Sequence, residues 1–184
     1  NWLRYWLGRL VVLSQADRVR AAGERIRQSL IKLGVEESKI STRPVVPNAP
    51  FDYSDELRGQ YSGYEKKFVW AGRMEPVKNL FFLIDVFSEV LIKYPRWLLL
   101  LVGDGSQRQD LEEKVKKANL EKNIIFVGWV HNPFVYLANA DIVVFSSQSE
   151  GYGLVAMEAA AAGTPIIMTD VGVANYELKP GPKV

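Results

Sequence analysis

The feature that most constrains the fold is an almost continuous apolar run, Trp97–Val102, followed at once by a glycine turn. A strand with one solvated face alternates apolar and polar residues, whereas an uninterrupted run is typical of a strand buried on both faces, as in a parallel sheet. Shorter apolar runs at 68–71, 124–127, 142–145 and 165–168 repeat the pattern. The sequence therefore predicts a sheet that is covered on both sides.

Helical segments separate these runs. Apolar residues at helical spacing predict helices over residues 80–91, 106–118, 132–139 and 154–162. Strand and helix alternating at this spacing imply right-handed crossovers, and hence an α/β fold with a doubly wound parallel sheet. Such sheets bind ligands at the carboxyl ends of their strands, so the loops that follow strands are where a site is expected.

The first part of the chain follows a different pattern. Its predicted elements are a helix over 1–16, a strand over 17–21, a helix over 24–33 and an extended segment over 40–46. The polar stretch 51–67 predicts a loop. We expect three parts: the end of a first domain (1–48), a linker (49–67) and a second domain (68–184) that is incomplete at its C-terminus. The chain lacks an initiator Met and stops in turn-forming residues, so we expect truncation at both ends.

Composition excludes several kinds of chemistry. Without cysteine there is no disulfide framework and no thiolate, and the single histidine, His131, rules out a metal cluster built from several histidines. A formal charge of +2 is too small to argue for nucleic acid as a partner. No apolar run reaches the roughly 18 residues that span a bilayer. A cytoplasmic location is compatible with these facts. The basic and aromatic residues 1–9 could contact the inner face of a membrane, although a packed amphipathic helix is the simpler interpretation.

The loop that follows the run at 68–71 carries two cations. Gly72 permits a close turn, and Arg73 and Lys78 lie where the next helix begins. Backbone N–H groups at a helix start also point outward, so the segment suits a diphosphate. Taken alone, a pair of solvated basic residues in a loop is the more common use of such a pattern.

The loop after Trp97–Val102 is Gly103-Asp104-Gly105. Its two glycines do not extend to the dinucleotide-binding fingerprint, because Arg108 stands where the third glycine belongs. A plain turn is therefore the better interpretation. Ser106 and Gln109 are spaced as a capping box, which predicts that the next helix begins there.

The loop after the run at 142–145 is the third candidate. Two glycines flank Tyr152 and let the backbone approach a ligand, and the free amides from Gly151 to Leu154 could hold an anion. Glu158 follows within an apolar helix, where an unpartnered carboxylate is costly to bury. Ribose hydroxyls are suitable partners, because one ionised carboxylate accepts two of them. A basic side chain elsewhere in the fold is the alternative partner.

These residues resemble those of a known family. Glu150 and Glu158, separated by seven residues, are similar to the paired glutamates of family 4 retaining glycosyltransferases with the GT-B fold. Arg73 and Lys78 resemble that family's phosphate-binding segment. Other similar segments follow in the family's order: Leu101–Gly105, Phe126–Val130, Ala140–Ile142 and Ala162–Ile166. The chain departs from the family's pattern at 48–52 and after Gly172.

The resemblance implies a fold and a set of roles. The fold is the Rossmann-like C-terminal half of GT-B, truncated, with residues 1–48 as the end of the acceptor-side domain. Arg73, Lys78 and Glu150 would be catalytic, with the two cations on the donor diphosphate and the carboxylate near the donor sugar or its phosphates. Glu158 would bind the ribose. The remaining donor-binding residues would be Gly72, Val130, Gly151, Tyr152, Gly153 and Leu154, with Val130 beside the base.

The implied reaction moves a sugar from a UDP- or GDP-sugar to a glycan or lipid-linked acceptor, with retention of configuration, as in polysaccharide biosynthesis. No Asp-x-Asp motif is present, so neither a metal nor another cofactor is expected. The isolated fragment is expected to be inactive. Two alternatives remain open: a GT-B-like nucleotide-sugar epimerase and a non-catalytic nucleotide-sugar-binding fragment.

Overall fold

The computed structural model describes residues 15–47 and 54–181. The chain divides into two compact units, one made of residues 1–46 and 172–184 and the other of residues 47–171. All but the last two residues of the helix expected over 1–16 lie outside the described residues. Within the described residues, no helix has both the length and the apolar character needed to cross a bilayer.

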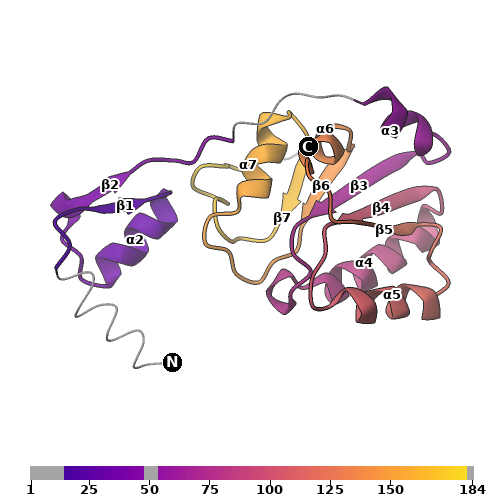
Figure 1. Ribbon diagram of the computed structural model, residues 1–184, viewed down its shortest axis with the longest axis horizontal. Coiled ribbons are helices and arrows are strands. Elements are labelled where there is room, and N and C mark those ends of the chain that lie inside the picture. The colour runs from indigo at the N-terminus through magenta and orange to yellow at the C-terminus, as the bar shows by residue number, and fades with distance from the viewer. Residues whose placement is uncertain (1–14, 48–53, 182–184) are drawn as a thin grey trace. The chain divides into compact units, whose positions relative to one another are not determined.

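The second unit is built on a five-stranded sheet (Figure 1). Its strands are β3 (Lys66–Ala71), β4 (Trp97–Val102), β5 (Ile124–Gly128), β6 (Ile142–Phe145) and β7 (Ile166–Met168). All pairs are parallel, in the order β5-β4-β3-β6-β7. The chain moves outward from β3 in one direction and then in the other, which defines a doubly wound sheet. The predicted fold class is confirmed.

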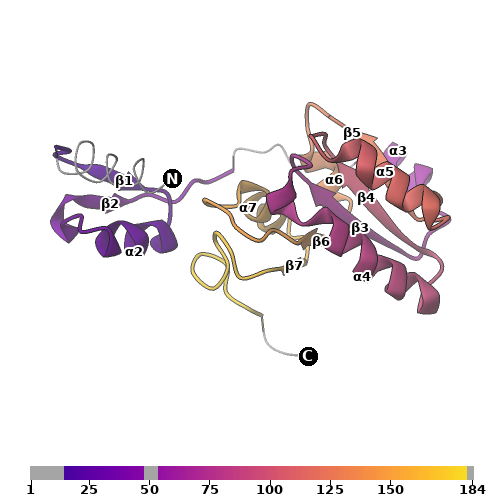
Figure 2. The ribbon, with the colours of Figure 1, turned by 90° about the horizontal axis from the view of Figure 1, so that it is seen from below.

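Helices cover both faces of this sheet. They are α3 (Asp55–Gln60), the 3-10 turn η3 (Pro76–Lys78), α4 (Leu80–Lys93), α5 (Arg108–Lys117), α6 (Phe134–Ala138) and α7 (Leu154–Ala161). Figure 2 shows α4 and α5 side by side on one face, and α6 and α7 contact each other on the opposite face. The sheet is therefore the middle layer of three.

The central strands show why the apolar runs are continuous. Along β3, Phe68 and Trp70 pack into the core on the side of α4 and α5, while Val69 and Ala71 pack on the side of α6 and α7. Leu98 to Val102 of β4 alternate between the same two cores and are almost completely buried. The residues Phe68–Ala71 and Leu98–Val102 thus remove apolar surface from water, which is the main favourable term in folding.

The first unit is smaller. Its elements are β1 (Val19–Ala21), α2 (Glu24–Lys32), the 3-10 turn η2 (Glu37–Lys39) and β2 (Ile40–Thr42), with β1 and β2 parallel. The Arg25 guanidinium donates to the carbonyls of Gly172 and Ala174, at 2.9 and 3.1 Å. These bonds tie the described residues after 171 to α2.

Two local predictions are wrong. The stretch 51–67, expected to be a loop, contains helix α3, because the Ser54 hydroxyl caps it by accepting from the Leu57 amide at 3.2 Å. The capping box at Ser106 does not form either. Helix α5 begins at Arg108, and its N-cap residue makes no side-chain capping bond. Ser106 instead has a partner outside the helix, described below.

Candidate active site at the carboxyl ends of the strands

The loop 72–79 leaves the carboxyl end of β3, the central strand of the sheet. Because β3 pairs with β4 on one side and β6 on the other, the loops that follow those strands flank it. Backbone contacts from both neighbours hold loop 72–79 in place. The three loops that the sequence singled out therefore meet at one edge of the sheet.

The loop after β4 packs directly on the backbone of loop 72–79. The Met74 amide donates to the Asp104 carbonyl at 2.8 Å, and the Gln107 amide donates to the Met74 carbonyl at 3.0 Å. A Cβ at Gly103 would lie 1.9 Å from the Gly72 carbonyl oxygen, and a Cβ at Gly105 would lie 2.6 Å from the Met74 nitrogen. The two glycines are thus needed for close packing of two loops.

The loop after β6 holds the other end of loop 72–79. The buried Ser146 hydroxyl donates to the Lys78 carbonyl at 2.7 Å, and the Gln148 amide donates to the Val77 carbonyl at 2.8 Å. Asn79 then adopts the left-handed conformation, with φ 55°, where α4 begins. These constraints fix the backbone from which the Lys78 side chain projects.

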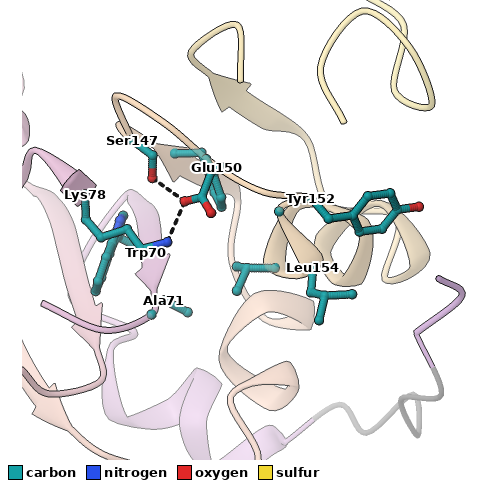
Figure 3. A pocket seen from close by; sticks show the side chains of 11 residues that line it. Trp70, Ala71, Lys78, Ser147, Glu150, Tyr152 and Leu154 are labelled. Atoms are coloured by element: carbon teal, nitrogen blue, oxygen red, sulfur yellow. Dashed lines mark hydrogen bonds and ion pairs between the residues drawn. The ribbon is translucent and has the colours of Figure 1, made fainter. Parts of the chain in front are cut away.

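Lys78 and Glu150 meet in a pocket of about 300 Å³ (Figure 3). The Lys78 ammonium lies 2.5 Å from a Glu150 carboxylate oxygen, and the Ser147 hydroxyl donates to that oxygen at 2.7 Å. The pocket is lined by Trp70, Ala71, Gly72, Lys78, Phe145, Ser147, Glu150, Tyr152, Gly153, Leu154 and Val155. Figure 3 shows the Tyr152 ring directed away from the Lys78–Glu150 pair.

The N-terminus of α7 opens into the same pocket. Gly153 is its N-cap residue, in the left-handed conformation with φ 92°, and no side chain caps the helix there. Leu154 and Val155, the first two helical residues, line the pocket. Amides of a first helical turn lack partners within the helix, so this end carries a partial positive charge opposite Lys78.

A second hollow, of about 180 Å³, lies on the other side of Gly72. It is lined by Gly72, Arg73, Val102, Gly103, Asp104, Trp129, Val130 and Pro133. Gly72 borders both hollows, so the two are adjacent: Lys78 lines the first and Arg73 lines the second. Val130 lines the second hollow, whereas the exposed His131 does not, and its ring lies 6.3 Å from the Trp129 ring in an edge-type arrangement.

Glu158 lies on α7, one turn beyond Leu154, and is half-buried. Within the described residues, no hydrogen bond or ion pair engages its carboxylate, so the basic partner considered above is not found there. Burial raises the pKa of the Glu158 carboxyl. Neither Glu158 nor the exposed Gly151 lines either of the two hollows. Their predicted contacts with a donor stay predictions.

No three or more His, Cys, Asp or Glu side chains gather in a way that could hold a metal ion, among the residues that the structure describes. The charged side chains that line the two hollows are instead two cations, Arg73 and Lys78, and two carboxylates that are each paired with a cation, Glu150 with Lys78 and Asp104 with Arg108. The arrangement suits an anionic ligand.

Comparison with known proteins identifies the family. The family described as glycosyl transferases group 1 matches residues 56–182, well over half of the chain. The chain belongs to this family. An uncharacterized glycosyltransferase of Methanocaldococcus jannaschii is 36% identical over 128 residues, 68% of this chain and 32% of that protein. The lipopolysaccharide core biosynthesis mannosyltransferase LpsB of Rhizobium meliloti is 27% identical over 178 residues, 94% of this chain and 49% of LpsB.

Solved structures share the fold of this group 1 glycosyl transferase chain. Anabaena HepE, crystallised with UDP and glucose, superposes with a TM-score of 0.81 at 19% identity, covering 94% of this chain and 49% of HepE. TarM of S. aureus superposes with a TM-score of 0.71 at 27% identity, covering 88% of this chain and 32% of TarM. The chain spans about half or less of the length of the relatives that it matches.

Sequence reasoning missed two residues of this group 1 glycosyl transferase site. Ser147 holds the Glu150 carboxylate, and Trp129, 71% exposed, borders the second hollow. Both residues follow the carboxyl end of a strand, where ligands bind in such sheets, so their position in the sequence could have indicated them as site residues. The role of the glycines at 103 and 105 could not be found that way, because it depends on how closely two loops approach.

Proposed function

We propose that this chain forms the donor-binding part of a retaining glycosyltransferase, which moves a sugar from a nucleotide-diphosphate sugar to a glycan or lipid-linked acceptor. The observation that carries the proposal is the pocket that Lys78 and the uncapped N-terminus of α7 both line. Both supply positive potential to one small volume, and Arg73 adds a second cation next to it. Membership of the group 1 family supports the same conclusion.

The geometry suggests how the chain would promote transfer. Cleavage of the glycosyl bond passes through an oxocarbenium-like state, and negative charge builds on the departing diphosphate. Arg73, Lys78 and the first amides of α7 would meet that charge in fixed positions. Groups that interact more strongly with the transition state than with the ground state accelerate the reaction. In this proposal no metal takes part.

Glu150 has a separate role in the proposal. Its carboxylate is held by Ser147 and Lys78, so it is oriented before any ligand arrives. A diphosphate that enters the pocket gives Lys78 a second anionic partner, and Glu150 would then face the sugar. Glu158 would accept hydrogen bonds from the ribose hydroxyls, which would compensate for burial of its unpartnered carboxylate.

UDP is the first nucleotide to test, because HepE was crystallised with UDP and glucose. Val130 and the exposed Trp129 would lie beside the base in the second hollow. We place the reaction in the cytoplasm, at the inner face of the membrane when the acceptor is lipid-linked. The lipopolysaccharide core mannosyltransferase among the relatives supports an acceptor of the glycan class.

The test is a calorimetric titration of this chain with UDP, GDP and ADP, each compared with its nucleoside. Lys78→Ala and Arg73→Ala should weaken binding of one diphosphate, whereas Lys116→Ala, an exposed lysine on α5, serves as the matched control. Binding of a diphosphate that neither variant weakens would contradict the proposed site. A folded chain that binds none of the three at millimolar concentration would contradict donor binding itself.

A further inference from the structure

We propose that Glu75, Ser106 and Gly105 form a clasp that positions Arg73 at the donor diphosphate. None of the three touches the ligand in this scheme, so they are positioning residues. The inference rests on the proposed function, because Arg73 has a phosphate to bind only if that function holds. Four observations support it, and each concerns the contact between loop 72–79 and the loop after β4.

The first observation is that Arg73 projects from a backbone that is fixed at its next residue. Arg73 is exposed, whereas Met74 is completely buried in the core on the side of α4 and α5. The Met74 amide and carbonyl are both bonded to the loop after β4, at 2.8 and 3.0 Å. Arg73 is thus the direct neighbour in the chain of Met74, which is held by core packing and by two backbone hydrogen bonds.

The second observation is the partner of Glu75. The Ser106 hydroxyl donates to one Glu75 carboxylate oxygen at 2.7 Å, and the Ser106 amide donates to the other at 3.4 Å. The Glu75 amide in turn donates to the Arg73 carbonyl at 2.8 Å, which closes a tight turn over 73–75. A bond made at Glu75 therefore restrains the backbone of Arg73 two residues earlier.

The third observation is that Ser106, and not Arg73, bonds the Glu75 carboxylate within the described residues. The pKa of the Glu75 carboxyl is lowered, first by the hydrogen bonds from Ser106 and to a smaller extent by the charge of Arg73. Glu75 is therefore close enough to attract Arg73, yet its carboxylate is satisfied by Ser106. Without Ser106, the free carboxylate would compete with a diphosphate for the guanidinium.

The fourth observation concerns Gly105. A Cβ there would lie 2.6, 2.7 and 2.8 Å from the nitrogen, oxygen and carbonyl carbon of Met74, closer than real Cβ atoms approach. The absence of a side chain at 105 lets Ser106 reach Glu75. Since α5 does not begin until Arg108, Ser106 is not used as a helix cap and its hydroxyl is available for the clasp.

The experiment measures calorimetric affinities of this chain for UDP and for uridine. Ser106→Ala and Glu75→Ala should each weaken UDP binding by about three- to tenfold, the range for loss of one hydrogen bond, and leave uridine binding unchanged. Ser106→Thr and Glu75→Gln keep the hydroxyl and an acceptor oxygen, so they should restore most of the affinity. Ser62→Ala, an exposed serine of the same unit, is the matched control.

A double variant separates positioning from a general structural effect. In the Arg73→Ala background, Ser106→Ala should cause no further loss of UDP affinity, because the clasp acts through Arg73. An equal loss in both backgrounds, or an equal loss for UDP and uridine, would overturn the inference. Hydrogen exchange gives a readout without ligand: the Met74 amide should exchange faster in Ser106→Ala than in Ser62→Ala, and unchanged exchange would also overturn the clasp.

Loss of donor binding and loss of the clasp would give different experimental results. If the unmodified chain binds none of UDP, GDP and ADP, the proposed function and this inference fall together. If UDP binds and Arg73→Ala weakens it while Ser106→Ala and Glu75→Ala do not, only the clasp is wrong. A GDP or ADP preference in the unmodified chain replaces UDP as the probe, with guanosine or adenosine in place of uridine.

Discussion

The Lys78 ammonium and the Glu150 carboxylate form an ion pair of 2.5 Å across 72 residues of sequence, and the pair lies in the pocket that α7 opens into. Their side chains are 21% and 12% exposed, so both charges are largely removed from water. Each therefore depends on the other in the ligand-free protein. A phosphate that enters the pocket must therefore share Lys78 with Glu150, because Lys78 already has an anionic partner.

Lys78→Ala tests the phosphate role directly. The variant should bind UDP about tenfold or more weakly, because a charge-assisted contact is lost, and should bind uridine as the parent does. Isothermal calorimetry with both ligands measures the difference, and Lys116→Ala is the control. An equal loss of affinity for UDP and for uridine would contradict a role of Lys78 in binding phosphate.

Glu150→Gln should have opposite effects on stability and on binding. It leaves the Lys78 charge without a carboxylate, so the free energy of unfolding should fall by about 1–3 kcal/mol. UDP should then stabilise the variant more than the parent, because the diphosphate no longer shares Lys78 with a second anion. Thermal melts with and without UDP check this, with exposed Glu89→Gln of α4 as control. An equal or smaller shift on adding UDP contradicts it.

Glu158→Gln should change the pH dependence of stability. The folded-state pKa of Glu158 lies above its unfolded value because burial disfavours the carboxylate. Between those two values the folded state holds more protons, so this group makes stability fall as pH rises through that window. The glutamine variant lacks this slope, so its stability relative to the parent should grow as pH rises from 4 to 7, by denaturant titration. Parallel curves for the two proteins would contradict the prediction.

Gly103→Ala should destabilise the fold. Gly103 has φ 132°, and a Cβ there would collide with the Gly72 carbonyl oxygen at 1.9 Å. We expect a loss of about 1–3 kcal/mol in the free energy of unfolding, as for other strained backbone positions. Gly63→Ala is the matched control, since a Cβ at Gly63 meets nothing within 4 Å. Similar urea midpoints for the two variants would show that the loops can separate without cost.

Gly151→Ala should weaken binding of UDP-glucose without changing the stability of the fold. A Cβ at Gly151 meets nothing within 4 Å, so thermal stability should not change. If the backbone there approaches a donor sugar, UDP-glucose should bind the variant more weakly than the parent while UDP binding is retained. Calorimetry with both ligands measures this, and unchanged UDP-glucose affinity would remove Gly151 from the predicted donor contacts.

The sheet could be predicted because its information is local. Ile142–Phe145 is a strand over the same residues that the apolar run marks, and β4 matches Trp97–Val102. β3 begins earlier than its apolar run, at Lys66, because Lys66 and Lys67 pair with Trp97 and Leu98 of β4. Asp141 also accepts a hydrogen bond from the Lys67 amide at 2.8 Å. That contact joins residues far apart in the sequence, and no periodicity contains it.

The site was less predictable because its side chains make contacts with residues that are far apart in the sequence. Spacing brought Arg73, Lys78 and Glu150 to attention, but it did not show that Glu150 pairs with Lys78. The spacing of Ser106 to Gln109 predicts a helix cap, whereas in the structure the Ser106 hydroxyl donates to Glu75 of another loop. Spacing rules consider only partners that are close in the sequence, so they miss hydrogen bonds between two loops that are far apart in the sequence.

The position of loop 72–79 between two neighbours has a consequence for folding. Its contacts with the loop after β4 join residues about 30 apart, but the anchors of Lys78 come from Ser146 and Glu150, about 70 residues later. Contacts between distant residues close larger loops and form more slowly. The ability to hold a diphosphate should therefore appear only after β6 has docked on β3, so that a bound nucleotide reports that these two strands have paired.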